Sequence, residues 1–292
     1  MHFSKSRDIA AARKVPIEDI RTVCLFLGPY RNLTTLSASI LFLHPNCQVL
    51  NHAANRIFGD PRLDFLDGYD DAKFDTFVRY AIRASAGGGR GKLGGSITFS
   101  HAFDQEHVTR DLFASTGGQL VKTTIRSLVW KESLRTSNRI RETKIDLARV
   151  FERNSRLRFL LPIRNPIDCA FSNRKSGHVN LFAGLDDDSP IERVVEAILD
   201  EIAWVRKNQR SYPERFFIYF EPEFDANTVV QLAEFLQLEP KDDWKQNALS
   251  AFEIKKRYEH PEPLVTHYRQ AVQGRFSDDA EFANRLLRFV ES

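Results

Sequence analysis

The sequence predicts an α/β fold in three layers, in which a doubly wound, mainly parallel sheet lies between two layers of helices. Short apolar runs that suit buried strands alternate along the chain with runs of helical periodicity. Two strand–helix junctions also carry residue types that bind phosphate at a strand end. At 292 residues, 42% of them hydrophobic, the chain can bury a sizeable core. We therefore expect one α/β domain over residues 21–292, preceded by a polar extension over residues 1–20.

The first strand–helix unit lies near the amino terminus. The apolar run 22–27 predicts a strand and the apolar run 36–43 predicts a helix, with residues 28–35 as the loop between them. Strand, loop and helix in this order form the framework of a phosphate-binding loop.

This loop matches the pattern G-x-x-x-x-G-K-[ST] only in part. Gly28 and Thr35 fit the pattern, but Leu33 stands at its second Gly and Thr34 at its Lys. Without that Lys the loop lacks the positive charge that ATP-hydrolysing enzymes place on the terminal phosphates. The pattern therefore favours phosphate binding but disfavours ATP hydrolysis.

The next segment carries a second predicted strand and a glycine-rich run. Residues 48–50 suit a strand, with Asn51 and His52 at its carboxyl end, and residues 71–86 have the apolar spacing of an amphipathic helix. Residues 87–95 hold six glycines in nine positions, which predicts a flexible loop. A mobile lid over a bound ligand is the alternative interpretation.

Three further elements are predicted before the middle of the chain. Residues 96–101 suit a strand ending at His101, and residues 104–115 suit a helix. Residues 119–124 suit another strand, which carries Lys122. The basic residues over 135–149 are expected to form a solvated helix face.

The second phosphate-type junction follows the apolar run 157–163, a predicted buried strand. Arg164 ends this strand, Asn165 suits an N-cap and Pro166 suits the first position of a helix. Ser172 lies two helical turns further on. A guanidinium, free helix N–H groups and a hydroxyl that converge at a strand end make a site for a terminal phosphate.

Composition narrows the function classes. One more strand is predicted over residues 215–220 and one more helix over residues 228–238. The net charge of +3 over 81 charged residues does not indicate a nucleic-acid binder. No apolar run reaches the length of a membrane span, so a cytoplasmic location is expected. The cysteines lack metal-ligand spacing and are expected to be reduced, mostly buried thiols: Cys24, Cys47 and Cys169.

The two phosphate-type junctions together resemble those of sulfotransferases that use 3′-phosphoadenosine 5′-phosphosulfate (PAPS). The first is similar to the family's loop, usually [Lys/Arg]-Ser-Gly-Thr-Thr, which stands here as Arg31, Asn32, Leu33, Thr34 and Thr35. The resemblance implies that the backbone N–H groups of residues 32–35 and the Thr hydroxyls hold the 5′-phosphosulfate. It also implies that Arg31 brings positive charge to the bridging oxygen.

The same resemblance implies the remaining cofactor contacts. Arg164 and Ser172 would hold the 3′-phosphate of PAPS. Near the carboxyl terminus, Gly274-Arg275-Phe276 is similar to the family's Gly-[Arg/Asp]-Trp loop, so Arg275 would meet the 3′-phosphate again. Phe276 departs from the Trp of that loop.

Candidate catalytic residues follow from the chemistry of sulfuryl transfer, which needs in-line geometry, positive groups at the leaving oxygen and a base. His52 is the first candidate for general base and His101 the second, because a neutral imidazole titrates near working pH. By the resemblance, Lys122 would approach the sulfuryl group, and Thr124 replaces a His that some family members use as base. The 3′,5′-bisphosphate (PAP) is already a good leaving group, so no metal is required.

The sequence therefore predicts a PAPS-dependent sulfotransferase that acts on an acceptor hydroxyl, such as that of a carbohydrate, a glycolipid precursor or another small molecule. Two alternatives stay open at this point. One is a P-loop kinase or nucleotide triphosphatase. The other is a nucleotide-binding protein without turnover, for which Asn32, Leu33 and Thr124 would be substitutions of a degenerated enzyme. The oligomeric state is not predicted.

Overall fold

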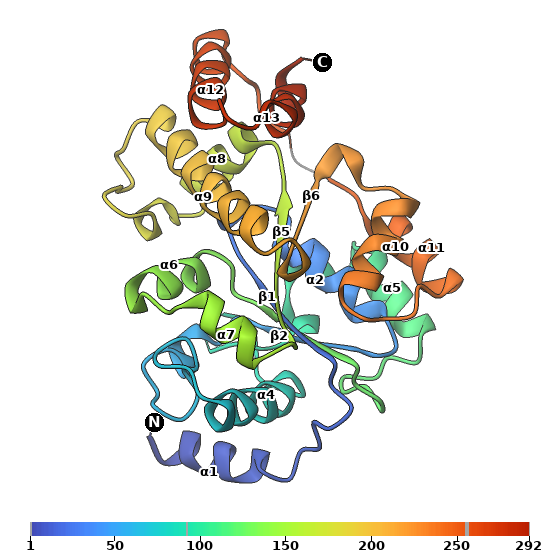
Figure 1. Ribbon diagram of the computed structural model, residues 1–292. Coiled ribbons are helices and arrows are strands. Elements are labelled where there is room, and N and C mark those ends of the chain that lie inside the picture. Colours follow the sequence, from blue (N-terminus) through green and yellow to red (C-terminus); the bar gives the residue numbers. More distant parts are fainter. Residues whose placement is uncertain (1, 92, 255–256, 292) are drawn as a thin grey trace.

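A six-stranded sheet forms the centre of the computed structural model, which describes residues 2–91, 93–254 and 257–291 (Figure 1). The strands lie in the order β3-β2-β4-β1-β5-β6. Their bounds are β1 (Thr22–Phe26), β2 (Cys47–Asn51), β3 (Gly95–Ser96), β4 (Ser127–Lys131), β5 (Leu157–Ile163) and β6 (Phe216–Phe220). All neighbours pair in parallel except β3, which is antiparallel to β2. This arrangement confirms the predicted, mainly parallel sheet.

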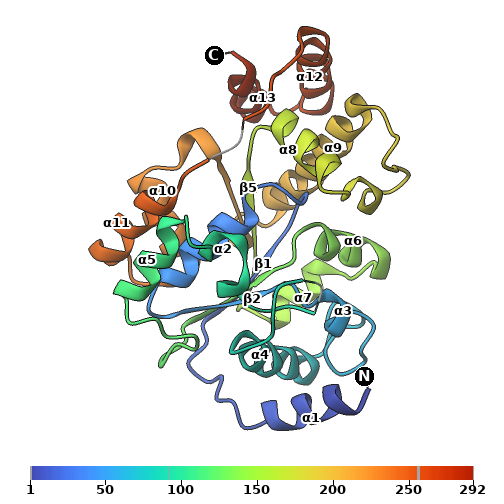
Figure 2. The same ribbon diagram turned by 180° about the vertical axis from the view of Figure 1, so that it is seen from behind.

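Helices cover both faces of the sheet (Figures 1 and 2). One face packs against α2 (Thr34–Leu43), α5 (Val108–Ser115), α10 (Ala226–Phe235) and α11 (Asp242–Ala251). On the other face lie α4 (Asp71–Ser85), α6 (Leu134–Thr143), α7 (Leu147–Arg153), α8 (Pro166–Lys175) and α9 (Ile191–Ser211). Outside them, α1 (His2–Ala12) packs on α4, and α12 (Glu262–Arg275) packs on α9 and on α13 (Ala280–Leu287). The short helix α3 (Ala54–Ile57) follows β2. The fold is thus the predicted three-layer α/β architecture.

The side chains of each strand alternate between the two layers, as the geometry of a strand requires. On β1, Val23 and Leu25 belong to one apolar cluster, whereas Cys24 and Phe26 belong to the other. Because both faces are covered, the strands are apolar throughout and β1 is buried at every position. Each fully buried Leu or Phe side chain contributes about 1.5–3 kcal/mol to folding.

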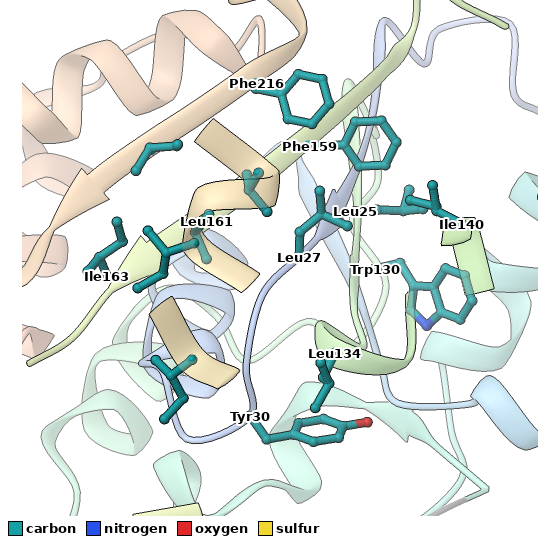
Figure 3. Packing of buried hydrophobic residues seen from close by; sticks show 14 of the residues in the cluster. Leu25, Leu27, Tyr30, Trp130, Leu134, Ile140, Phe159, Leu161, Ile163 and Phe216 are labelled. Carbon is teal, nitrogen blue, oxygen red and sulfur yellow. The ribbon is translucent and has the colours of Figure 1, made fainter. Parts of the chain in front are cut away.

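Aromatic pairs extend this packing between strands. Figure 3 shows part of the larger cluster, in which Phe159 of β5 lies beside Phe216 of β6. The two residues are partners in the strand register, and their rings stack with centroids 4.9 Å apart. Such a pair fixes the register of β5 and β6, because a shift of one residue would turn either ring to the other face.

Several predicted elements are confirmed with small changes in their bounds. The predicted strands 22–27, 48–50, 157–163 and 215–220 are observed as β1, β2, β5 and β6. The predicted helix 71–86 is α4, which buries its predicted apolar face, and the predicted helix 228–238 overlaps α10. The expectation for the cysteines is confirmed, since Cys24, Cys47 and Cys169 are all free and buried.

Two predicted strands are wrong. Only Ser96 of the predicted strand 96–101 pairs in the sheet, and the chain then turns into the 3₁₀ helices η1 (Ile97–Phe99) and η2 (His101–Phe103). The Ser96 hydroxyl promotes this turn because it accepts a hydrogen bond from the Thr98 N–H. The helix predicted over 104–115 accordingly begins later, as α5.

The predicted strand 119–124 is also wrong. Leu120 and Val121 are 42% and 40% exposed, so this short apolar pair does not enter the core. The strand instead lies a few residues later, as β4, whose Leu128, Val129 and Trp130 are completely buried. The strand β4 has only three apolar residues, and polar residues, Ser127 and Lys131, stand at its two ends. Such a short run does not predict a buried strand from the sequence.

The amino-terminal segment folds onto this domain. Residues 1–20 read as a polar extension, yet they supply α1 and bury Ile9, Ala12, Ile17 and Ile20 in the larger apolar cluster. Lys5 of α1 also pairs with Asp60 at 2.9 Å. Within the described residues, no helix combines the length and apolar character needed to span a bilayer.

Candidate functional site

A pocket of about 780 Å³ opens where the parallel strands end. Because the carboxyl ends of β1, β2, β4 and β5 meet at one edge of the sheet, the loops that follow them surround this pocket. The predicted residues among its lining are Arg31, Leu33, Thr34, Thr35, His52, His101, Arg164 and Ser172. The fold thus brings both phosphate-type junctions and both candidate bases to one cavity.

The loop after β1 takes a left-handed backbone at two positions although neither of them is a glycine. Leu33 takes the left-handed conformation, with φ 61° and ψ 2°, and caps the start of α2. Arg31 also has a positive φ of 63°. A leucine rarely adopts this conformation, which glycine adopts freely. Thr34, Thr35 and Leu36, the first residues of α2, line the pocket, and the left-handed backbone places strain at Leu33.

Asn32 ties the two junctions together. Its side chain is completely buried and turns into the protein, where the amide donates to the Pro162 carbonyl of β5. Its carbonyl oxygen accepts from the Arg164 N–H at 2.8 Å. Only the Asn32 backbone is therefore placed to meet a ligand, and the side chain fixes the loop to the end of β5. Sequence reasoning treated this residue as a departure from a hydroxyl and missed its bridging role.

Arg31 and Ser172 join the same two segments on the pocket wall. The Arg31 Nε donates to the Ser172 hydroxyl at 2.9 Å, across 141 positions of sequence. As predicted, Asn165 caps α8, since its side chain accepts from the N–H groups of Ile167 and Asp168. Arg164, just before α8, and Ser172, within α8, both line the cavity.

A buried carboxylate behind Arg164 was not predicted. Asp168 is completely buried, and its Oδ2 lies 3.5 Å from Arg164 Nη2. Its Oδ1 accepts from the Tyr258 N–H at 3.1 Å and lies 2.8 Å from His260 Nε2. The carboxylate thus attaches the segment before α12 to the start of α8. In the same segment, Arg257 pairs with the buried Glu221. This basic residue is the sequence signal that could have indicated that the segment lies near the site.

Arg275 does not belong to this site. The predicted loop 274–276 is wrong, because α12 runs through Arg275. The Arg275 guanidinium pairs with Asp200 at 2.6 Å and approaches Glu196 at 3.9 Å, and both acids belong to α9. Arg275 is not among the residues that line the pocket.

Lys122 is likewise placed away from the pocket. It precedes β4 and therefore lies near the amino end of that strand, not at the carboxyl end where the prediction needed it. Its ammonium sits 4.3 Å from the centre of the Phe42 ring, and burial lowers its pKa. Thr124 lies in the same segment before β4, so it is not at the carboxyl end of a strand either.

Lys131 occupies the position that was expected of Lys122. It is the last residue of β4, lines the pocket and is only 4% exposed. Burial lowers its pKa to about 8, although the neighbouring Glu132 charge opposes this effect. Its ammonium lies 3.4 Å from His52 Nε2. An ammonium with so little hydration interacts strongly with a bound anion.

His52 stands on a strained turn after β2. His52 and Ala53 both have positive φ, at 57° and 83°. The His52 N–H donates to the Lys131 carbonyl at 3.0 Å, and the His52 carbonyl accepts from Trp130 Nε1 at 2.5 Å. These contacts fix the backbone of the turn from which His52 lines the pocket.

Gly94 supports the His52 turn from behind. A Cβ at this position would lie 2.4 Å from the Ala53 nitrogen and 2.5 Å from the Asn51 oxygen, and its φ is +69°. We expect Gly94→Ala to lower the free energy of unfolding by about 2 kcal/mol or more, because both the clash and the left-handed backbone oppose a side chain. Urea denaturation measures this loss.

Gly89→Ala is the matched control, since a Cβ there meets no atom within 4 Å. It should change stability by less than about 1 kcal/mol. Equal destabilisation by the two variants would contradict the supporting role of Gly94.

His101 reaches the pocket from η2 and not from a strand end. Desolvation at the pocket wall and the positive charges of Arg31 and Lys131 lower its pKa. His178 lines the pocket too, and its ring packs 5.2 Å from the Tyr30 ring. Burial and the nearby Arg31 and Lys131 charges lower the pKa of His178 as well. Both rings are thus held toward the neutral form, in which one ring nitrogen can accept a proton.

No protein-family model and no curated protein matches this chain. Among solved structures, the chain is similar to the mouse sulfotransferase SULT7A1 complexed with PAP, at 9% sequence identity and a TM-score of 0.45. That comparison covers 97% of this chain and 93% of the mouse chain. The chain is also similar to the sulfotransferase STF9 from Mycobacterium avium, at 14% identity and a TM-score of 0.45. There the comparison covers 96% of this chain and 80% of the mycobacterial chain.

Proposed function

We propose that this chain is a sulfotransferase that takes a sulfuryl group from PAPS and places it on an acceptor hydroxyl. The observation that carries the proposal is the meeting of two phosphate-type junctions on one pocket wall, where Arg31 donates to Ser172 at 2.9 Å. One ligand with phosphates at both ends of a nucleoside explains both junctions, and PAPS is such a ligand.

The residues present fit that ligand. The backbone N–H groups of residues 32–35 and the hydroxyls of Thr34 and Thr35 hold the 5′ end, with Arg31 beside the bridging oxygen. Arg164 and Ser172 hold the 3′-phosphate through charge-assisted hydrogen bonds. PAPS supplies the sulfuryl group, which passes to the acceptor oxygen as the bond to the 5′-phosphate oxygen breaks.

The chain's own groups then handle the proton and the charge. His52 accepts the proton of the acceptor hydroxyl, with His101 as the second candidate for this role. Lys131, in place of Lys122, supplies positive charge where negative charge develops on the leaving oxygen. Both groups line the pocket, and His52 and Lys131 are already in contact.

A polar acceptor fits this pocket best. The pocket lining includes imidazole and guanidinium groups, namely His52, His101, Arg135 and His178. Such groups hydrogen-bond the hydroxyls of a carbohydrate or glycolipid precursor, whereas a purely apolar acceptor would leave them unpaired.

A thermal-shift titration with PAP tests the proposal, with magnesium ATP and a 2′,5′-bisphosphate as comparisons. A ligand that binds only the folded chain raises the melting temperature, and at a given concentration a tighter ligand raises it more. Stabilisation by PAP alone supports the proposal and justifies a screen of acceptors with PAPS. Stabilisation by magnesium ATP instead would favour a kinase, and binding of PAP without turnover of any acceptor would favour an inactive nucleotide-binding protein.

The lowered pKa of Lys131 predicts that a rise in pH weakens PAP binding but raises the free energy of unfolding of the ligand-free protein. Its pKa in the folded chain is about 8, below the ordinary value of about 10.4, so the ammonium is lost as pH rises through about 8. PAP binding should then weaken by about tenfold or more, because a charged hydrogen-bond donor is lost. Between these two pKa values the unfolded chain binds more protons, so the free energy of unfolding of the ligand-free protein should rise.

Urea denaturation and PAP titrations across this pH range measure both effects. Lys131→Met is the control, since it removes the titrating group at similar volume, and both pH dependences should flatten in it. Unchanged pH dependences in the variant would rule out Lys131 as their source.

A further inference from the structure

Glu132 is a buried carboxylate that none of the predicted roles uses. It directly follows β4, is 1% exposed and borders the pocket. Its Oε1 accepts from the Tyr30 hydroxyl at 2.5 Å, and its Oε2 accepts from the Ala54 N–H at 3.2 Å. Oε2 also lies 3.9 Å from His52 Nδ1. One carboxylate therefore joins the phosphate loop, the turn that carries His52 and the end of β4.

The contacts of His52 specify where its proton resides. A Lys ammonium has three donors and no acceptor. Its approach to His52 Nε2 at 3.4 Å is therefore favourable only when Nε2 carries a lone pair. A neutral imidazole then has its proton on Nδ1, the nitrogen that faces the Glu132 carboxylate. Lys131 and Glu132, acting on opposite ring nitrogens, favour the same tautomer.

We propose that Glu132 is a positioning residue, whose nearby negative charge favours the proton of His52 on Nδ1 and thereby leaves the lone pair on Nε2, the nitrogen that Lys131 approaches. The role of His52 as base rests on the proposed function, but the tautomer of His52 does not.

Other charged and titratable groups face this part of the wall and bear on the same ring. Lys131 ends β4 beside it, and Arg135 of α6 donates to Asn55 of α3 at 2.9 Å. His178 follows α8 and interacts with His52 electrostatically. The Tyr30 hydroxyl, at the end of a ring packed in the core, donates to Glu132 (Figure 3). Among these groups, Glu132 is the one whose negative charge attracts a proton to Nδ1.

Nitrogen-15 NMR of the imidazole rings in the ligand-free protein, at about pH 7.5 where an ordinary imidazole is mostly neutral, tests the proposal. A His52→Gln variant assigns the His52 signals. In the unmodified chain we expect the Nδ1–H form to dominate, with an unprotonated Nε2. In Glu132→Gln the Nε2–H form, which free histidine prefers, should gain population.

Glu132→Gln keeps the packing. The Gln oxygen can accept from the Ala54 N–H. The Gln NH₂ can donate to the Tyr30 hydroxyl, which then accepts a hydrogen bond where it donates one to Glu132. Glu262→Gln is the matched control, because it makes the same change of charge at an exposed site on α12. It should leave the His52 signals unchanged. If Glu132→Gln does not fold, the signals of the unmodified chain still decide, since a dominant Nε2–H form there overturns the proposal.

Kinetics supply a second readout. Once an acceptor is found, Glu132→Gln should lower kcat by about tenfold or more, as part of the roughly 10²- to 10⁴-fold contribution of a general base. The stabilisation by PAP should change little, because the phosphate contacts remain. An unchanged kcat, or a His52 tautomer unaffected by Glu132→Gln, overturns the positioning role. If no PAP binding is found, the proposed function fails, whereas the tautomer result stands.

Discussion

Arg164→Ala is expected to abolish most of the stabilisation by PAP. The guanidinium lines the pocket at the end of β5 and is 7% exposed, so its hydrogen bonds to a phosphate would be shielded from water. Loss of one partner from such a charged pair costs about 2–5 kcal/mol, which corresponds to a dissociation constant raised about 30-fold or more. Thermal-shift titration with PAP measures the change.

The variant has a second consequence, because Asp168 would keep its buried charge while one neighbouring cation is lost. Its melting temperature without ligand must therefore be recorded as the baseline for the titration. Arg275→Ala is the matched control, since this Arg sits on α12 in ion pairs with α9 and away from the pocket. It should leave PAP binding intact. An equal loss of PAP binding in both variants would mean that Arg164 has no special role.

Asn32→Ala is expected to lower the free energy of unfolding by about 2–5 kcal/mol. The substitution leaves the buried Pro162 carbonyl and the buried Arg164 N–H without their partner, and each such group costs about 1–3 kcal/mol. The loop would also lose its attachment to the end of β5, so PAP binding should weaken although the Asn32 side chain touches no ligand. Urea denaturation measures the first effect and thermal-shift titration the second.

Asn227→Ala tests whether removal of any Asn has this effect. Asn227 is exposed near the start of α10, so its loss should change stability by less than about 0.5 kcal/mol. If Asn32→Ala unfolds at the same urea concentration as the unmodified chain, its side chain does not join the two junctions.

Sequence reasoning found those parts of the site that local patterns specify. The strand, N-cap, proline and hydroxyl over residues 157–172 follow one another closely, and the structure places them as predicted. The sequence also predicts the loop over residues 28–35, because an apolar strand precedes it and an apolar helix follows it directly. In both cases backbone preferences and short spacings carry the information.

The parts it missed depend on contacts between distant segments. Lys131 was overlooked because its strand has only three apolar residues, and its site role depends on which strands lie side by side. Glu132 follows it on a polar turn and becomes significant only through Tyr30 and His52. Asp168 was read as part of a helix start, although its partners lie 90 residues away. No periodicity in the sequence encodes such pairings.

Leu33 shows that a left-handed turn before a helix does not need glycine. A leucine in the left-handed region costs about 1–2 kcal/mol relative to a residue free to adopt it, so local preference alone would not produce this conformation. The loop holds its shape because its neighbours are fixed at both ends, by Asn32 on one side and by α2 on the other. A left-handed backbone can therefore persist at a position where the sequence holds no glycine. Sequence patterns that require glycine at such a position will overlook loops of this kind.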